Sequence, residues 1–124
     1  MAISKKIFLL ILILFLVPAS AFSKDLVLNN TPVQVYFSPD GGCQQAIINQ
    51  INMAKSEILV QAYSFTSAPI AKALIEAFKR GVKVEAILDR SQKKERYTSA
   101  TFLSNSRVPT FIDSKQAIAH NKIM

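Results

Sequence analysis

The sequence predicts an α/β fold, a sandwich of helices around a mixed β-sheet, and two observations support this prediction. Two runs rich in β-forming residues, 57–63 and 82–88, flank a segment of helical periodicity at 70–80. Because the links between them are short, they form a βαβ unit whose strands are parallel and whose crossover is right-handed. A helical segment at 97–105 and a strand at 108–113 then continue the same alternation.

The N-terminal segment has the pattern of a secretory signal peptide at residues 1–21. Lys5 and Lys6 precede an unbroken apolar run at 7–17, and small residues suited to signal peptidase follow at 19–21. A membrane-spanning helix needs roughly 20 apolar residues, so this run is too short to be one. We therefore expect a periplasmic or secreted protein, with an uncleaved N-terminal anchor as the alternative.

The mature chain is expected to start with a polar lead-in at residues 22–32, before a partial domain at residues 33–124. A strand is predicted at 33–37 and a turn at 38–42, where Pro, Asp and Gly cluster. The next segment, from Cys43 to Lys55, has apolar residues at helical spacing: Ile47, Ile48, Ile51 and Ala54.

The central βαβ unit carries clear signals for the ends of its helix. Ser67 is placed to cap the helix, and Pro69 is tolerated in the first turn. Gly81 ends the helix, directly before the strand at 82–88, which Asp89 follows. The apolar face of the helix consists of Ile70, Ala71, Leu74, Ile75 and Phe78.

The C-terminal part is expected to contain an exposed charged loop at 90–96, the helix at 97–105, the strand at 108–113 and the start of another strand at 117–124. This last strand is apolar and runs to Met124, and nothing after it covers the sheet. We therefore expect the chain to be a fragment, incomplete at its C-terminus.

Composition limits the classes of partner and site. Removal of Lys5 and Lys6 leaves 13 basic and 8 acidic residues, a net charge of +5. Such a balance favours a polyanion such as nucleic acid or anionic lipid, although charge for solubility explains it equally well. Cys43 is the lone cysteine and suits a helix start or packing, or an intermolecular disulfide. With one histidine, His120, the chain offers no multi-histidine metal site.

The triplet 120–122 contains the residues with the clearest chemical potential. On a strand, His120 and Lys122 would project to the same side because side chains alternate. An imidazole can attack phosphorus or move protons, and an ammonium can hold anionic oxygens. The alternative is a histidine at a sheet edge beside a solvated lysine. Two other strand ends favour structural roles. Packing and helix entry explain residues 63–66 better than a site does, and for Asp89 a place near the site is the minor alternative.

The segment 118–124, Ile-Ala-His-Asn-Lys-Ile-Met, resembles the opening of the phospholipase D superfamily signature, His-x-Lys followed after four residues by Asp. The Asp position lies beyond Met124. Residues 35–39 resemble the family's opening strand, and 58–66 and 70–89 resemble the strands and helix of its small single-motif bacterial endonucleases. The resemblance covers nearly all of residues 33–124.

The resemblance implies a three-layer α/β/α sandwich and two-step hydrolysis of phosphodiesters through a phosphohistidine, without metal or other cofactor. It makes His120 the nucleophile or the acid/base and Lys122 a ligand of the substrate phosphate. Two motif histidines are needed, so a chain with one motif is expected to form a homodimer with one shared active site.

The function expected from the resemblance is that of a secreted endonuclease. DNA is its main expected substrate, and RNA is the second. The first alternative is a phospholipase D that hydrolyses phosphatidylcholine-type lipids, which would need an apolar surface that the sequence does not reveal. The second alternative is an inactive fragment. Lys93, Lys94, Arg96 and Arg107 are read as solvated loop charges in preference to phosphate contacts.

Overall fold

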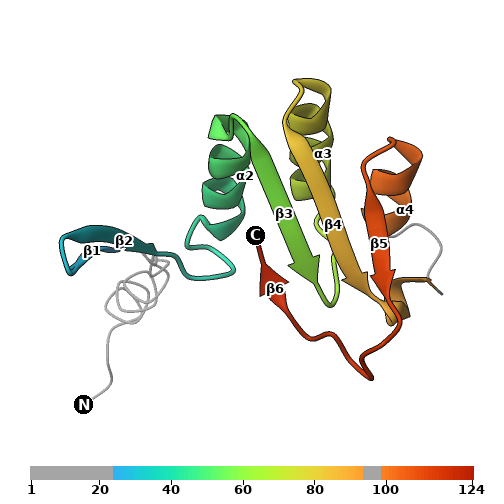
Figure 1. Cartoon of the computed structure of the whole chain (residues 1–124). Coiled ribbons are helices and arrows are strands. Elements are labelled where there is room, and N and C mark those ends of the chain that lie inside the picture. The colour runs from blue at the N-terminus through green and yellow to red at the C-terminus, as the bar shows by residue number, and fades with distance from the viewer. Residues whose placement is uncertain (1–23, 94–98) are drawn as a thin grey trace, which may run out of the picture. The chain divides into compact units, whose positions relative to one another are not determined.

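The computed structural model describes residues 24–93 and 99–124 (Figure 1). The chain divides into two compact units, which meet between Cys43 and Gln44 and are described separately. The predicted signal peptide lies outside the described residues, as do residues 94–98 of the charged loop. Within the described ranges, no helix combines the length and the apolar character needed to cross a membrane.

The first unit contains a β-hairpin that the sequence analysis did not predict. Strand β1 (Lys24–Leu28) pairs antiparallel with β2 (Thr31–Val35), so a strand lies within the polar lead-in expected at residues 22–32. The turn consists of Asn29 and Asn30, with φ angles of 47° and 62°. Asparagine tolerates this left-handed region better than most residues, and two such residues form the tight turn typical of hairpins. The strand predicted at 33–37 corresponds to β2, which begins and ends two residues earlier.

The second unit is built on a four-stranded mixed sheet, which confirms the predicted fold class. Its strands are β3 (Glu57–Ala62), β4 (Lys83–Asp89), β5 (Thr110–Asp113) and β6 (Lys122–Ile123), in the spatial order β5-β4-β3-β6 (Figure 1). The pairs β3–β4 and β4–β5 are parallel, and β6 is antiparallel to β3. The central βαβ unit is therefore present as the periodicity predicted.

The helices are α2 (Cys43–Met53), α3 (Ala68–Lys79) and α4 (Ser99–Asn105), with a short 3-10 turn at Arg90–Lys93. Helix α3 begins where the sequence predicts, because the hydroxyl of Ser67 accepts a hydrogen bond from the amide of Ile70. It ends before Gly81, whose φ of 91° favours a residue without a Cβ atom. The guanidinium of Arg80 donates to the carbonyl of Ile51 at 3.1 Å, which satisfies a carbonyl at the end of α2.

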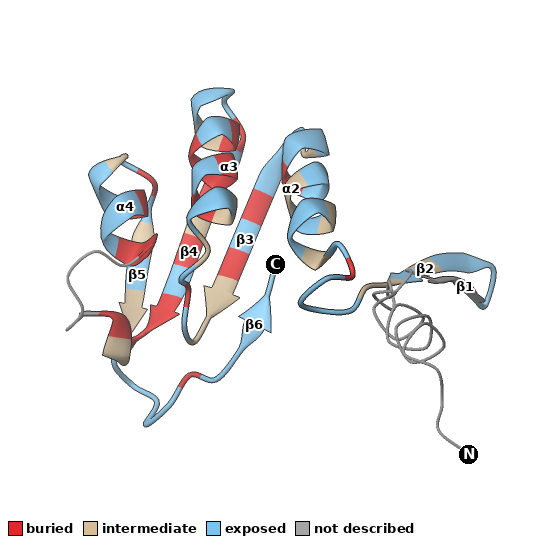
Figure 2. Cartoon of the chain, turned by 180° about the vertical axis from the view of Figure 1, so that it is seen from behind, coloured by how far each residue is buried: buried red, intermediate tan, exposed pale blue. Residues whose placement is uncertain are grey.

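The helices pack on one face of the sheet, and the hydrophobic core lies between the two layers (Figure 2). Alternate residues of β3 and β4 point into this core: Ile58, Val60, Val84, Ala86 and Leu88. The intervening residues face the other way, and Leu59, Ile87 and Phe111 are exposed there. The described residues thus provide the sheet and one helical layer of the expected sandwich.

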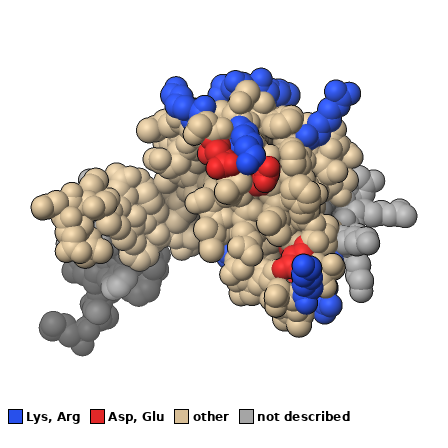
Figure 3. Space-filling model, viewed as in Figure 1, with Lys and Arg blue, Asp and Glu red and all other residues tan. Residues whose placement is uncertain are grey.

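Basic residues of this unit gather where the parallel strands begin. Lys79, Arg80 and Lys83 lie around the start of β4, and Arg107 lies between α4 and the start of β5. In the face drawn in Figure 3, Lys and Arg accordingly concentrate at the top, over the amino ends of the strands. These basic residues therefore lie at the amino edge of the parallel strands, opposite to the edge formed by the carboxyl ends of the strands.

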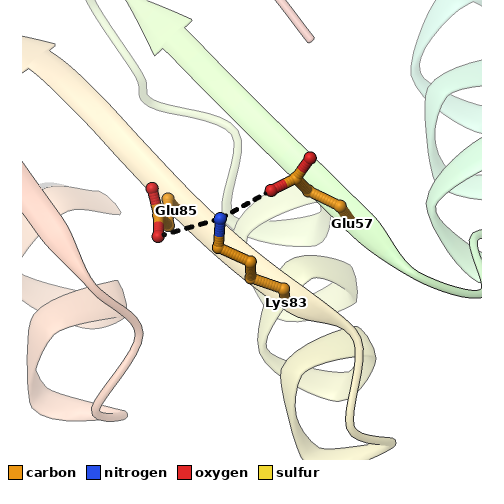
Figure 4. A network of polar contacts seen from close by, with 3 residues as sticks. All are labelled: Glu57, Lys83 and Glu85. Atoms are coloured by element: carbon orange, nitrogen blue, oxygen red, sulfur yellow. Dashed lines mark hydrogen bonds and ion pairs between the residues drawn. The ribbon is translucent and has the colours of Figure 1, made fainter.

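An ion-pair network occupies the open face of the sheet near the same amino ends (Figure 4). The ammonium of Lys83 lies 2.7 Å from Glu57 and 3.4 Å from Glu85. The hydrogen bond to Glu57 is the main cause that raises the pKa of Lys83, followed by the attraction of the two carboxylates. All three side chains are exposed, and ion pairs of this kind contribute little to stability. The network belongs to the surface of the fold rather than to a site.

The last strand is shorter than predicted. Only Lys122–Ile123 pairs with β3, so His120 lies in the loop before β6 and not within a strand from 117 to 124. Ala119 is buried and the amide of Asn121 donates to its carbonyl at 2.9 Å, which closes a tight turn around His120. The Asn121 amide and the Ala119 carbonyl therefore bond to each other and not to a neighbouring strand.

Candidate functional site

The candidate site lies at the edge of the sheet where the parallel strands end. Because β3, β4 and β5 are parallel, their carboxyl ends lie together at this edge. Tyr63 directly follows β3, and Asp89 and Asp113 are the last residues of β4 and β5. Strand β6 is antiparallel and therefore begins at this edge, directly after His120. In open α/β sheets, ligands bind outside the carboxyl ends of the strands, so this edge is where a site is expected.

His120 is carried by a loop that crosses the sheet edge. Strands β5 and β6 lie at opposite ends of the strand order, so residues 114–121 must pass the ends of β4 and β3 (Figure 1). Asp89 Oδ2 accepts a hydrogen bond from the amide of Ala119 at 2.7 Å. The amide of Tyr63 donates to the carbonyl of Asn121 at 2.8 Å. The loop is thus held on both sides of His120.

The imidazole of His120 and the ammonium of Lys122 are in direct contact. His120 Nε2 lies 3.2 Å from Lys122 Nζ, and both side chains are exposed. A lysine ammonium has three donors and no acceptor, so a hydrogen bond here needs an unprotonated Nε2, with the proton on Nδ1. In that tautomer, the contact places the Nε2 lone pair beside the positive charge of Lys122.

Tyr63 touches both members of this pair. Its ring centroid lies 4.6 Å from that of His120, with the planes tilted by 57°. Lys122 Nζ lies 5.7 Å from the same tyrosine centroid, within the range of a cation–π contact. The aromatic ring thus provides a wall for the imidazole and a favourable electrostatic surface for the ammonium.

Asp89 is buried at the end of β4 and stays charged there because backbone amides donate to it. The hydrogen bond from Ala119 is the main cause that lowers the pKa of Asp89, followed by the hydrogen bond from the Ser91 amide. A lowered pKa in the folded state means that this carboxylate stabilises the fold above the pKa of an unfolded aspartate. The contribution is lost as the pH falls through the lower, folded-state pKa.

The structure brings together more residues than the sequence analysis assigned to the site. His120 and Lys122 are adjacent as expected, although a turn and not strand alternation brings them together. Tyr63 was read as a packing residue and instead contacts the imidazole, whereas its neighbour Phe65 is buried in the core. For Asp89 a place near the site is the minor alternative in the sequence, and the structure shows that its carboxylate contacts the His120 loop. The signal for both was their place directly at or after a strand end.

Other candidate residues lie elsewhere. Arg107 precedes β5 and so lies at the opposite edge of the sheet, and residues 94–98 are outside the described chain. Cys43 is the first residue of α2, as the helix-start interpretation predicted. Across residues 24–93 and 99–124, no cluster of three or more His, Cys, Asp or Glu side chains is placed to hold a metal ion.

Comparison with known proteins identifies the family. The family model "Cardiolipin synthase, PLD-like domain" matches residues 47–124. The chain is 40% identical over 97 residues to a phospholipase D of Rickettsia conorii, covering 78% of this chain and 48% of that protein. It is 41% identical over 92 residues to a phospholipase D of Rickettsia felis, covering 74% of this chain and 46% of that protein. The chain therefore spans about half the length of the curated relatives that it matches.

Two solved structures share the fold. Nuc of Salmonella typhimurium, described as a phospholipase D family member, aligns with a TM-score of 0.64 and 37% identity, over 70% of this chain and 59% of that one. NucT of Helicobacter pylori aligns with a TM-score of 0.52 and 23% identity, over 63% and 55% of the two chains, which supports the fold alone. Since the family model covers more than half of the residues, including His120 and Lys122, the chain belongs to the PLD-like domain family of the phospholipase D superfamily.

Proposed function

We propose that this chain is part of a phosphodiester hydrolase in which His120 is the nucleophile and Lys122 binds the substrate phosphate. The observation that carries the proposal is the contact of 3.2 Å between Nε2 and Nζ, at the carboxyl edge of the sheet. A lone pair beside a positive charge suits attack on a phosphorus whose anionic oxygens the ammonium neutralises. Since the groups needed are an imidazole and an ammonium, we propose a reaction that needs no metal.

In the first step, the lone pair of His120 forms a bond to phosphorus and the bond from phosphorus to the leaving oxygen breaks. The leaving oxygen takes a proton from a second imidazole, which is protonated at the start of the reaction. In the second step, that imidazole accepts a proton from water, the resulting hydroxide oxygen bonds to phosphorus, and the phosphorus–nitrogen bond breaks. The products are a phosphomonoester and an alcohol, and both histidines return to their starting states.

The second imidazole is proposed to come from a second copy of the chain, because His120 is the sole histidine of these 124 residues. A two-fold axis beside His120 would place the two equivalent imidazoles on either side of one phosphate. The exposure of His120 and Lys122 is consistent with a site completed by another molecule.

Nucleic acid is the proposed substrate class. The chain has a formal net charge of +7 at pH 7, of which +5 remains after loss of the proposed signal peptide. A cationic protein attracts a polyanion, and phosphate contacts make such binding steeply dependent on salt. The likeness to Nuc and the pattern of residues 1–21 support an exported nuclease, with DNA as the main substrate and RNA as the second.

Phospholipid is the second candidate substrate. Ile118 is 62% exposed in the loop that carries His120. Both Rickettsia relatives are also called phospholipase D. An exposed apolar side chain near a phosphate-binding pair suits contact with a phosphatidylcholine-type lipid.

One assay separates these functions. Two proteins are produced. One is the chain alone, and the other, the joined protein, is the chain fused to the part of the Rickettsia conorii relative that lies beyond the matched region. Each form is given plasmid DNA or phosphatidylcholine vesicles, with a chelator present. We expect the joined protein to cleave DNA, less efficiently as salt rises, and the chain alone to show no turnover. Cleavage of vesicles but not DNA would establish the lipid alternative, and loss of turnover with chelator would contradict the metal-free mechanism.

The shared site predicts a specific response to mixed subunits. When joined protein and its His120→Ala variant are mixed in equal amounts and allowed to exchange subunits, mixed dimers should be inactive. Activity per total protein should then fall to about one quarter, because only dimers with two wild-type subunits work. A fall to about one half, together with sedimentation as a monomer, would contradict the shared site.

A further inference from the structure

We infer that Asp89 is a positioning residue, whose buried carboxylate fixes the loop that carries His120 and so holds the imidazole against Tyr63 and Lys122. The structural part of this inference stands on the geometry. Its effect on turnover rests on the proposed function of the same site.

The topology creates the need for such an anchor. The loop 114–121 leaves β5 and must pass the ends of β4 and β3 before β6 begins. Asp89 is the last residue of β4, so it stands at the first strand end that the loop passes. Its bond to the amide of Ala119 joins residues 30 positions apart in the chain. Without it, the crossing segment would lose its attachment to the centre of the sheet edge.

The two oxygens of the carboxylate have different partners. Oδ1 accepts from the amide of Ser91 at 2.8 Å, which closes the turn directly after β4. Oδ2 accepts from the amide of Ala119 at 2.7 Å, which ties that turn to the His120 loop. The side chain is therefore a bridge between two segments and not only a cap for one of them.

Comparison with Asp113 shows that burial is not needed for capping. Asp113 pairs with Asp89 in the sheet register and also ends its strand. Its Oδ1 accepts from the amides of Lys115 and Gln116, at 2.8 and 3.3 Å, and these partners are local. Asp89 is only 2% exposed, and no ion pair of the described residues includes it. The cost of burying this charge is offset by the backbone amides, one of them from the His120 loop.

The anchor acts on His120 through its two neighbours. Ala119 is held by Asp89, and Asn121 is held through its carbonyl by the amide of Tyr63. With both flanking residues fixed, the imidazole has a defined position 4.6 Å from the Tyr63 ring. Release of Ala119 would leave one anchor, about which the His120 backbone could turn.

The test compares Asp89→Asn with the matched variant Asp113→Asn. An asparagine can accept only one of the two amide bonds, because its amino group would face a donor. His120 is the sole histidine of the 124-residue chain, so its ring gives one set of imidazole signals in a proton NMR spectrum. We expect the nuclear Overhauser contact between the His120 and Tyr63 rings to be lost in Asp89→Asn and kept in Asp113→Asn.

In the active joined protein, Asp89→Asn should lower kcat by about 100-fold and leave KM nearly unchanged, because the nucleophile is displaced while Lys122 remains in β6. Asp113→Asn should change neither constant appreciably. If folded Asp89→Asn keeps the ring contact, or keeps normal kcat despite losing it, the inference is wrong. An equal effect of Asp113→Asn would also overturn it.

A second variant covers the case in which Asp89→Asn does not fold. Ala119→Pro removes the amide that donates to Oδ2 but leaves the buried carboxylate and its Ser91 bond in place. It should also abolish the ring contact, and a retained contact would overturn the inference. If the wild-type protein hydrolyses no diester, the NMR result still decides the positioning role, and only the proposed function fails.

Discussion

Replacement of His120 by alanine is expected to lower turnover of a phosphodiester by at least about 1,000-fold. The imidazole supplies the electron pair that bonds to phosphorus, and His120 is the sole histidine of the 124-residue chain. The measurement is the rate of hydrolysis by the joined protein under saturating substrate. Gln116→Ala is the matched control, since Gln116 is an exposed side chain of the same loop and has no assigned role.

The same variant tests the covalent step. Acid-sensitive, base-stable phosphate should be trapped on the wild-type protein during turnover and should be absent from His120→Ala. If the variant keeps more than about one tenth of the wild-type rate, His120 is not the nucleophile. A variant that is inactive but still acquires the covalent phosphate would instead assign His120 to proton transfer.

Replacement of Leu74 by alanine is expected to lower the free energy of unfolding by about 3 kcal/mol. Leu74 is 0% exposed and lies on the face of α3 that packs against β3 and β4. Its loss removes buried apolar area and leaves a cavity, because neighbouring side chains relax only in part. The measurement is urea unfolding followed by circular dichroism, with the chain and the variant at equal concentration.

Leu59→Ala is the matched control for this substitution. Leu59 has the same side chain and is 53% exposed on the open face of the sheet. Its replacement should change the free energy of unfolding by less than about 1 kcal/mol. Equal losses in the two variants would contradict a hydrophobic core that is confined to the helical face of the sheet in this 124-residue chain.

Local sequence determined the central part of this fold. The spacing of apolar residues in α3, the Ser67 cap and Gly81 are signals that act within a few residues, and the structure places the helix accordingly. The alternation in β3 and β4 likewise reflects one face packed under helices. The sequence also indicated His120 and Lys122 as site residues, because their side-chain chemistry and the resemblance of 118–124 to the superfamily signature depend on residue identity and order alone.

Only the tertiary structure decided how these residues are held. The hairpin of β1 and β2, the antiparallel placement of β6 and the turn at His120 all depend on pairing between segments, which local periodicity does not encode. Asp89 and Tyr63 look like ordinary strand ends in the sequence. They join the site because the strand order sends the β5–β6 loop across the ends of β4 and β3, where a buried carboxylate and a free backbone amide need partners from a distant part of the chain.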